Sequence, residues 1–106
     1  MMRVVLTGSD NILRVDNLFD IINDKFENAA TISVTIYDDA DVVVAGIAWP
    51  IVLNYIPNSE GDYIGVLSDD AVFAIGSVYR AEIIVDAGVG KKLVENHELV
   101  ITDRQP

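Results

Sequence analysis

The stretch "FAIGSVYRAEIIVDAG", Phe73–Gly88, combines a glycine, a tyrosine three residues later and an alternating run. From Tyr79 onward every second side chain is small or apolar, and most side chains between them are polar, which predicts a half-buried strand. In antiparallel β-sandwiches, a tyrosine at this position buries its ring at the core edge, and its hydroxyl bonds upstream backbone. We therefore predict that Tyr79, after a chain reversal at Gly76, bonds a backbone group within Asp69–Gly76. The alternative is a core tyrosine after an ordinary turn.

The same period of two recurs along the whole chain. Its segments are rich in β-branched residues, and Gly, Pro, Asn and Asp separate them at short intervals. This pattern predicts one all-β domain over residues 1–106, an immunoglobulin-like antiparallel β-sandwich of about seven strands. The glycines of "GVGK" predict a tight hairpin. The predicted strands are "MRVVLT", "NILRV", "TISVTIYD", "WPIVLNYI", "YIGVL", "VYRAEIIVDA" and "KLVENHELVIT".

The sequence is compatible with two alternative structures for residues 16–29. Four apolar side chains of this segment recur at helical spacing, and Asp16 or Asn17 would cap a helix of about ten residues. The alternative is an extended segment that turns at Asn23 and Asp24, because both residue types tolerate left-handed backbone conformations. The apolar side chains at helical spacing are Leu18, Ile21, Ile22 and Phe26.

Composition excludes several classes of protein. The chain has 106 residues, of which 51% are hydrophobic, enough for the core of one domain and too apolar for a disordered chain. It has no cysteine, so it has no disulfide, thiol nucleophile or thiolate metal site. Seventeen acidic residues face seven basic ones, for a formal charge of −10, which disfavours nucleic-acid and anionic-membrane partners.

The sequence predicts a cytoplasmic location on synthesis. No apolar run reaches the length of a membrane span. The start, "MMRVVLTGSD", lacks the longer apolar region and the cleavage site of a signal peptide.

The central stretch from Asn23 to Asp70 contains an ordered set of short motifs: "NAAT" at Asn28, a hairpin that ends at Val44 and Gly46, Trp49-Pro50, and "GDYIGVL" from Gly61. In this order the motifs resemble those of a family of small immunoglobulin-like, fibronectin-type proteins of tailed phages and prophages. The similarity extends from about Asn11 onward. The chain departs from the family pattern in one hairpin, where Asp41 and Val43 replace the preferred glycine and proline. The resemblance implies a turn rather than a helix at residues 23–24, and a non-enzymatic virion or assembly protein. The matching residues are Asn28, Ala30, Thr31, Val44, Gly46, Trp49, Pro50, Gly61, Asp62, Tyr63, Gly65 and Leu67.

No motif in the sequence indicates catalysis, so we predict no catalytic, cofactor-binding or metal-binding residue. His97 is the single histidine, no G-x-S-x-G motif accompanies it, and it shares the phase of Leu99 and Ile101. We therefore predict a partly buried or edge histidine. "GVGKK" lacks the Walker spacing. Trp49 is either the core tryptophan of a sandwich or, if exposed, a carbohydrate platform.

Three acidic turns are either solvated turns or, where two of them meet, a calcium site. Their spacing matches no EF-hand loop, and Asp is a common turn residue, so we favour solvated turns. The acidic residues are Asp38, Asp39 and Asp41, then Glu60 and Asp62, then Asp69 and Asp70.

Two functions remain. The first is a phage or prophage structural or assembly protein that contacts itself, as a homo-oligomer, or other virion subunits. The second is a small soluble module that binds a carbohydrate or a protein. "DVVVAGIAW", Asp41–Trp49, is apolar and β-prone without Lys or Arg, so we predict contacts near Val43 and Ile47 through a sheet edge or face. A flat apolar patch or an open edge would favour the first function, and an exposed Trp49 the second.

Overall fold

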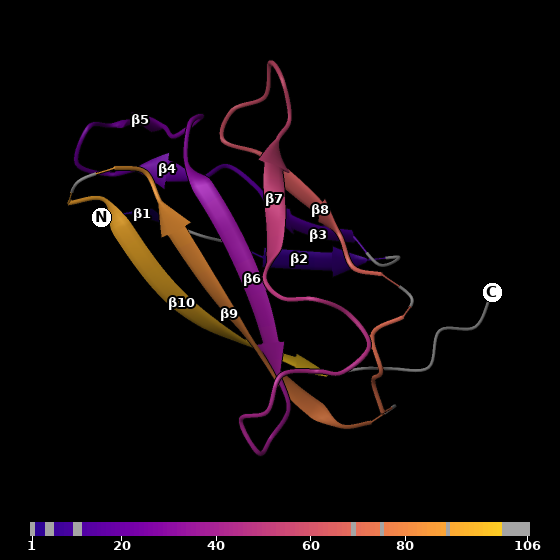
Figure 1. Ribbon diagram of the computed structural model, residues 1–106. Helices are drawn as coiled ribbons and strands as arrows, with labels where there is room; N and C mark the ends of the chain where they lie inside the picture. Colours follow the sequence, from indigo (N-terminus) through magenta and orange to yellow (C-terminus); the bar gives the residue numbers. More distant parts are fainter. Residues whose placement is uncertain are drawn as a thin grey trace.

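The chain forms an all-β structure. The computed structural model describes residues 2–3, 6–9, 12–68, 70–74, 76–88 and 90–100, and within these residues it contains strands and no helix (Figure 1). The strands are β1 (Met2–Arg3), β2 (Leu6–Ser9), β3 (Ile12–Val15), β4 (Phe19–Asp20), β5 (Lys25–Phe26), β6 (Thr31–Tyr37), β7 (Ile51–Tyr55), β8 (Tyr63–Val66), β9 (Val78–Asp86) and β10 (Lys92–Val100).

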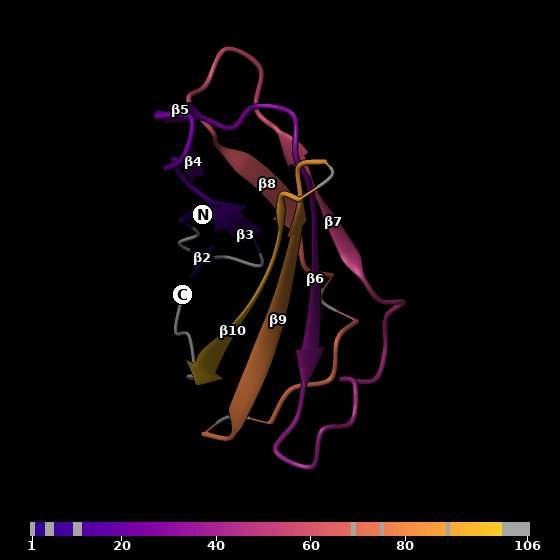
Figure 2. The same ribbon diagram turned by 90° about the vertical axis from the view of Figure 1, so that its left-hand side faces the viewer.

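The strands form two antiparallel sheets. A seven-stranded sheet has the order β10-β9-β6-β7-β8-β3-β2, and a small sheet has the order β1-β4-β5. β7 divides its pairing, because Ile51–Leu53 pair with β6 whereas Asn54 and Tyr55 pair with β8. The large sheet curls at this strand, so that β2 and β3 lie to one side of β6 and β9 (Figure 2). This is the all-β, sandwich-like architecture that the alternating pattern predicted.

The core lies between the inward faces of this curled sheet. β6 and β9 alternate strictly between buried and more exposed residues, because successive side chains point to opposite faces. β3, β7 and β8 supply further members of the cluster, and Leu18 and Val44 join it from loops. The buried apolar residues are Leu13, Val15, Leu18, Ile32, Val34, Ile36, Val44, Leu53, Tyr63, Tyr79, Ala81, Ile83 and Val85.

Residues 16–29 turn and do not form a helix. β4 and β5 pair antiparallel around a turn at residues 21–24, and Asp24 has a φ of 54°. The rings of Phe19 and Phe26 meet edge to face, with centroids 5.3 Å apart. The helical alternative is therefore wrong. It would have buried Ile22, which is 80% exposed beside the turn.

The β-prone segment Asp41–Trp49 forms a loop. Its one β-bridge joins Val43 to Tyr37. The chain then bends at Gly46, which has a φ of 103° and lies so close to the carbonyl of Asp70 that a Cβ would collide with it. β-propensity was overridden here because Val44 is buried from a loop position, 4% exposed.

Candidate functional site

Tyr79 occupies the predicted corner. Its side chain is 7% exposed, and its hydroxyl accepts a 2.7 Å hydrogen bond from the backbone N–H of Ala74. The ring meets Phe73 edge to face at 5.0 Å, and Gly76 between them has a φ of 85°. The sequence prediction is confirmed for this residue, and the residue's role is to hold the turn before β9.

Trp49 is fixed against the core. It packs on the buried cluster, and its indole Nε1 donates a 2.7 Å hydrogen bond to the carbonyl oxygen of Val44. A carbohydrate platform needs an aromatic face that is free to stack, so this contact favours the structural alternative for Trp49.

Tyr63 is a second buried tyrosine, which the sequence placed in the family-like pattern without a structural role. It is fully buried, and its hydroxyl donates to the carbonyl of Glu27 at 2.6 Å and accepts from the N–H of Ala30 at 3.1 Å. Burial raises the pKa of this hydroxyl above its ordinary value, so it remains a donor. Asn28 contributes to the same tie, since its Oδ1 accepts from the N–H of Gly61 at 2.8 Å.

Several residues of the family-like pattern therefore meet at one place. Asn28, Ala30, Gly61 and Tyr63 belong to two short motifs about thirty residues apart, and hydrogen bonds join the two motifs. The signal that could have identified the contact was the pairing of Asn28 with Gly61-Asp62-Tyr63 in one pattern. In the structure these hydrogen bonds join the loop before β6 to the start of β8.

The acidic turns are tied to backbone. One carboxylate oxygen of Asp38 accepts from the N–H groups of Ala40 and Val42 at 2.9 and 3.0 Å. Asp62 accepts from the N–H of Asn17 at 2.8 Å. Asp69 lies outside the described residues. Among the described residues no group of three or more His, Asp or Glu side chains is placed to hold a metal ion.

His97 lies on β10 at the end of the large sheet. Its Nε2 is 3.1 Å from Oε1 of Glu95, and both side chains are about 30% exposed. This is the partly buried edge histidine that the sequence predicted in phase with Leu99, while Ile101 lies outside the described residues.

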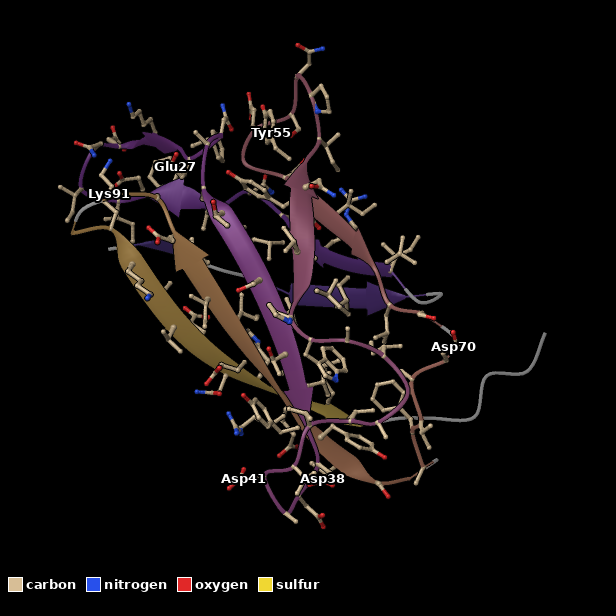
Figure 3. The ribbon with its side chains drawn as sticks, viewed as in Figure 1. Glu27, Asp38, Asp41, Tyr55, Asp70 and Lys91 are labelled. Atoms are coloured by element: carbon tan, nitrogen blue, oxygen red, sulfur yellow. The ribbon has the colours of Figure 1, made fainter. Side chains whose placement is uncertain are left out.

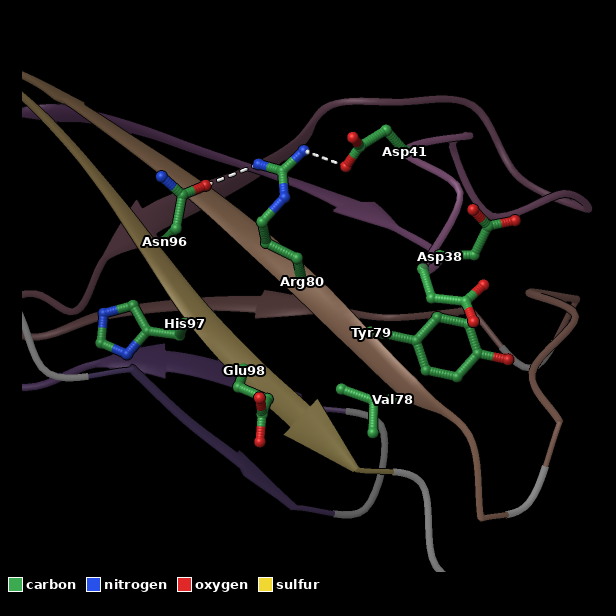
Figure 4. Close-up of a pocket in the computed structure, with 9 residues that line it drawn as sticks. Asp38, Asp41, Val78, Tyr79, Arg80, Asn96, His97 and Glu98 are labelled. Atoms are coloured by element: carbon green, nitrogen blue, oxygen red, sulfur yellow. Dashed lines mark hydrogen bonds and ion pairs between the residues drawn. The ribbon is translucent and has the colours of Figure 1, made fainter.

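A hollow of about 300 Å³ lies beside the ends of β9 and β10 (Figure 4). Arg80 is its central cation, and its guanidinium donates to Asn96 at 2.6 Å and to Asp41 at 3.2 Å, above the ring of Tyr37 at 4.4 Å. These contacts engage the guanidinium within the protein, so the hollow offers no free cation to an anionic ligand. It is lined by Asp38, Asp39, Asp41, Val78, Tyr79, Arg80, Asn96, His97 and Glu98.

Asp20 is a buried carboxylate, 3% exposed, that the sequence reasoning did not single out. It accepts from Asn23 Nδ2 at 2.7 Å and from two backbone N–H groups of its turn, and Lys91 Nζ lies 3.2 Å away. The hydrogen bonds from Asn23, together with the charge of Lys91, lower its pKa from 3.8 to about 2 despite burial. The ion pair joins the turn after β9 to the turn after β4.

The outward face of the large sheet carries a cross-strand line of three apolar side chains and one serine on four strands. In the strand register Val52 lies opposite Ser33, Ser33 opposite Ile84, and Ile84 opposite Val94. Val52 and Val94 are 52% and 50% exposed. We call these four residues the outer row. Val43 is opposite Tyr37 and so extends this face toward the loop before β7.

Comparisons with protein-family models, with curated proteins and with solved structures found no match to this chain. The resemblance to the phage family therefore depends on the motifs quoted above. In the described part of the chain, no helix is long and apolar enough to cross a membrane.

Proposed function

We propose that this chain is a non-enzymatic structural or assembly protein of a phage or prophage, and that it acts through contacts with other protein subunits. Three features support the proposal: the strand order of the curled sheet, the buried Tyr79 corner typical of immunoglobulin-like sandwiches, and the motif pattern around Tyr63. Each is a structural device, and none belongs to a catalytic constellation.

The outer row is the observation that carries the proposal. It places exposed valines of β7 and β10 and the half-buried Ile84 of β9 on one line of a sheet face. Exposed apolar patches bordered by polar residues mark protein contact sites. Ser33 is the one polar member of this line. Trp49 is tucked against the core, which removes the feature that would favour the alternative, a carbohydrate-binding module.

The residues predicted as contacts lie at one end of this face. Val43 is 45% exposed beside Tyr37, and its neighbour Val42 is 56% exposed. Ile47 is half-buried, so it contributes less free surface than Val43. The proposed contact surface accordingly comprises the outer row together with Val43.

The proposed partners are other virion subunits or further copies of this chain, rather than nucleic acid or a membrane. A net charge of −10 keeps free chains apart in solution until a complementary surface is offered. Such a protein is made soluble in the cytoplasm and later docks on a particle.

The test is incorporation into particles. The gene is expressed with its neighbouring genes, particles are purified, and the protein is quantified by mass spectrometry. We expect Val52→Lys combined with Val94→Lys to lower incorporation about tenfold or more, because the charges interrupt a contact core that excludes them.

The matched controls are Ile21→Lys and Ile22→Lys, which are 49% and 80% exposed in the turn between β4 and β5, outside the large sheet. They should leave incorporation unchanged, and all variants should retain the wild-type melting temperature. Equal loss in controls and outer-row variants would remove the outer row as the contact. If the wild-type protein never enters particles or assembly intermediates, the structural role fails and the binding-module alternative replaces it.

A further inference from the structure

β10 ends the large sheet with one edge unpaired among the described strands. It pairs with β9 along all nine of its residues, and the sheet order continues no further on its other side. A strand of this length presents a row of free N–H and C=O groups, which is a template for pairing with another chain (Figure 1).

The inward face of β10 carries a self-complementary pattern. Its side chains there are Leu93, Glu95, His97 and Leu99, which lie opposite Val85, Ile83, Ala81 and Tyr79 of β9. All four are half-buried, so they remain partly accessible at the edge. When a second β10 is aligned antiparallel to the first about Asn96, each leucine faces a leucine and each glutamate faces a histidine.

We infer that two copies of this chain pair antiparallel through β10, with Asn96 at the two-fold axis. In this register Glu95 of one copy lies opposite His97 of the other, and Leu93 lies opposite Leu99. Opposite-charge or hydrogen-bonding pairs and apolar pairs directly across strands stabilise a sheet, and the two-fold axis makes each of them twice. The large sheet then continues through β10 into the second copy.

Neighbouring registers are less favourable. A shift that centres the pair on Glu95 places two glutamates face to face and sets Leu93 against His97. A shift that centres it on His97 sets Glu95 against Leu99. A shift by a single residue would place the inward face of one copy beside the outward face of the other, exposing the half-buried leucines.

This inference goes beyond the proposed function, because a β10 pair forms whether or not the protein joins a particle. Pairing of one edge strand buries less than the roughly 1,200 Å² of a standard stable interface. The repulsion between two chains of charge −10 opposes association further. We therefore expect a weak dimer, visible at high concentration or when trapped.

The first test exchanges the facing groups. His97→Glu alone sets Glu95 opposite a glutamate, and Glu95→Lys alone sets a lysine opposite His97, so each variant should associate at least about tenfold more weakly than wild type. A mixture of the two variants restores both facing pairs between unlike chains. Neither variant retains a Glu95–His97 contact within its own chain, so recovery in the mixture measures the contact between chains.

Sedimentation velocity of labelled chains measures association, with melting temperatures as a check on folding. We expect the mixture to associate at least as strongly as wild type. A mixture that associates no more strongly than either variant alone would overturn the register.

The second test traps the pair and needs no inward-facing substitution. The chain has no cysteine, so Asn96→Cys places one thiol on the exposed outward face at the proposed axis. Directly opposed residues of antiparallel strands have Cα atoms about 4.5–5.5 Å apart, within reach of a disulfide. We expect a covalent dimer under mild oxidation.

Val94→Cys and Glu98→Cys are the matched controls. In this register each of these cysteines lies about 14 Å from the same cysteine of the other chain, so each single variant should stay monomeric. A mixture of the two variants should crosslink as a heterodimer. Crosslinking of every single-cysteine variant to the same extent, or of none, would overturn the inference. Loss of incorporation in Val52→Lys, a substitution on β7, with intact Asn96→Cys crosslinking in the same chain would separate the two proposals.

Discussion

The two buried tyrosines use the same chemistry over very different distances in the chain. Tyr79 bonds Ala74, five residues upstream, and so closes one local corner. Tyr63 bonds Glu27 and Ala30, more than thirty residues away, and joins two separate loops. Figure 3 places Glu27, a partner of Tyr63, and Asp38, which lines the same hollow as Tyr79, at opposite ends of the molecule. One tyrosine thus shapes a turn, whereas the other holds parts of the chain together.

The glycines beside these tyrosines differ in the same way. Gly61 and Gly76 both have positive φ, of 73° and 85°. A Cβ added at Gly61 would lie 2.5 Å from the carbonyl oxygen of Leu18, whereas a Cβ at Gly76 would meet nothing within 4 Å. The difference indicates that the long-range contact at Gly61 and Tyr63 depends on a close approach of two backbone segments. The local turn before Tyr79 depends on the backbone conformation of Gly76 alone.

The largest expected effect is therefore at Gly61. We expect Gly61→Ala to destabilise the fold by about 3–5 kcal/mol, since a strained conformation is combined with a backbone collision that no side-chain motion relieves. Urea denaturation measures the change. A loss below about 1 kcal/mol would show that Leu18 and Gly61 separate easily, and that the long-range tie is weak.

Tyr63→Phe should have the next largest effect. Removing the hydroxyl leaves the carbonyl of Glu27 and the N–H of Ala30 without their partner, which we expect to cost about 2–3 kcal/mol. Hydrogen exchange sharpens the result, because the amide of Ala30 should lose protection whereas that of Ala74 should keep it.

The sequence predicted the local features of this comparison and missed the distant ones. The corner at Tyr79 follows from Gly76 and the alternation after it, all within a few residues. At residues 23–24 the residue types left a helix and a turn open, and the family-like pattern favoured the turn that the structure contains. The partners of Tyr63 and the Lys91 partner of Asp20 depend on how distant loops meet, which no local period encodes.

The conformation of the loop at residues 41–49 could not be predicted from the sequence, for a related reason. Its valines have high β-propensity, yet strand formation needs a partner in register. Here Gly46 instead packs against the backbone of Asp70, more than twenty residues away. Of the candidate residues, Tyr79 and His97 were placed correctly by their phase and neighbours. For Trp49 the sequence left two alternatives, and the structure favours packing against the core. The outer row emerged only once the register of four strands was known.

Tyr79→Phe should cost less than Tyr63→Phe, about 1–2 kcal/mol, because one hydrogen bond is lost and the ring keeps its contact with Phe73. Thermal unfolding of both variants under one condition measures the order. The comparison between the two tyrosines is wrong if Tyr79→Phe proves the more damaging substitution.

Gly76→Ala should cost about 1 kcal/mol, because only the positive φ opposes an alanine there. Gly90→Ala is the matched control, since Gly90 has a similar φ of 75° and also has open space around it. Similar losses at the two sites would confirm that conformation alone is involved. A loss at Gly76 as large as that at Gly61 would remove the distinction between the corner and the tie.

The smallest expected effect concerns Asp20, which also joins segments distant in sequence, through Lys91. Because its pKa falls from 3.8 to about 2 on folding, the ionised form stabilises the native state. That contribution is complete well above pH 3.8 and is lost as the pH falls from 3.8 through 2. Asp20→Asn should therefore reduce the slope of the unfolding free energy against pH in this window. The reduction should correspond to the uptake of at most one proton on unfolding.

The carboxyl titration of Asp20, followed by NMR, separates the causes of this shift. The side-chain hydrogen bond from Asn23 lowers the pKa most, so Asn23→Ala should raise it further than Lys91→Met, which removes only the ion pair and its hydrogen bond. The local partner would then set the titration, and the distant partner would mainly join the two turns. If Lys91→Met has the larger effect, the long-range contact dominates here too, and Asp20 resembles Tyr63 rather than Tyr79.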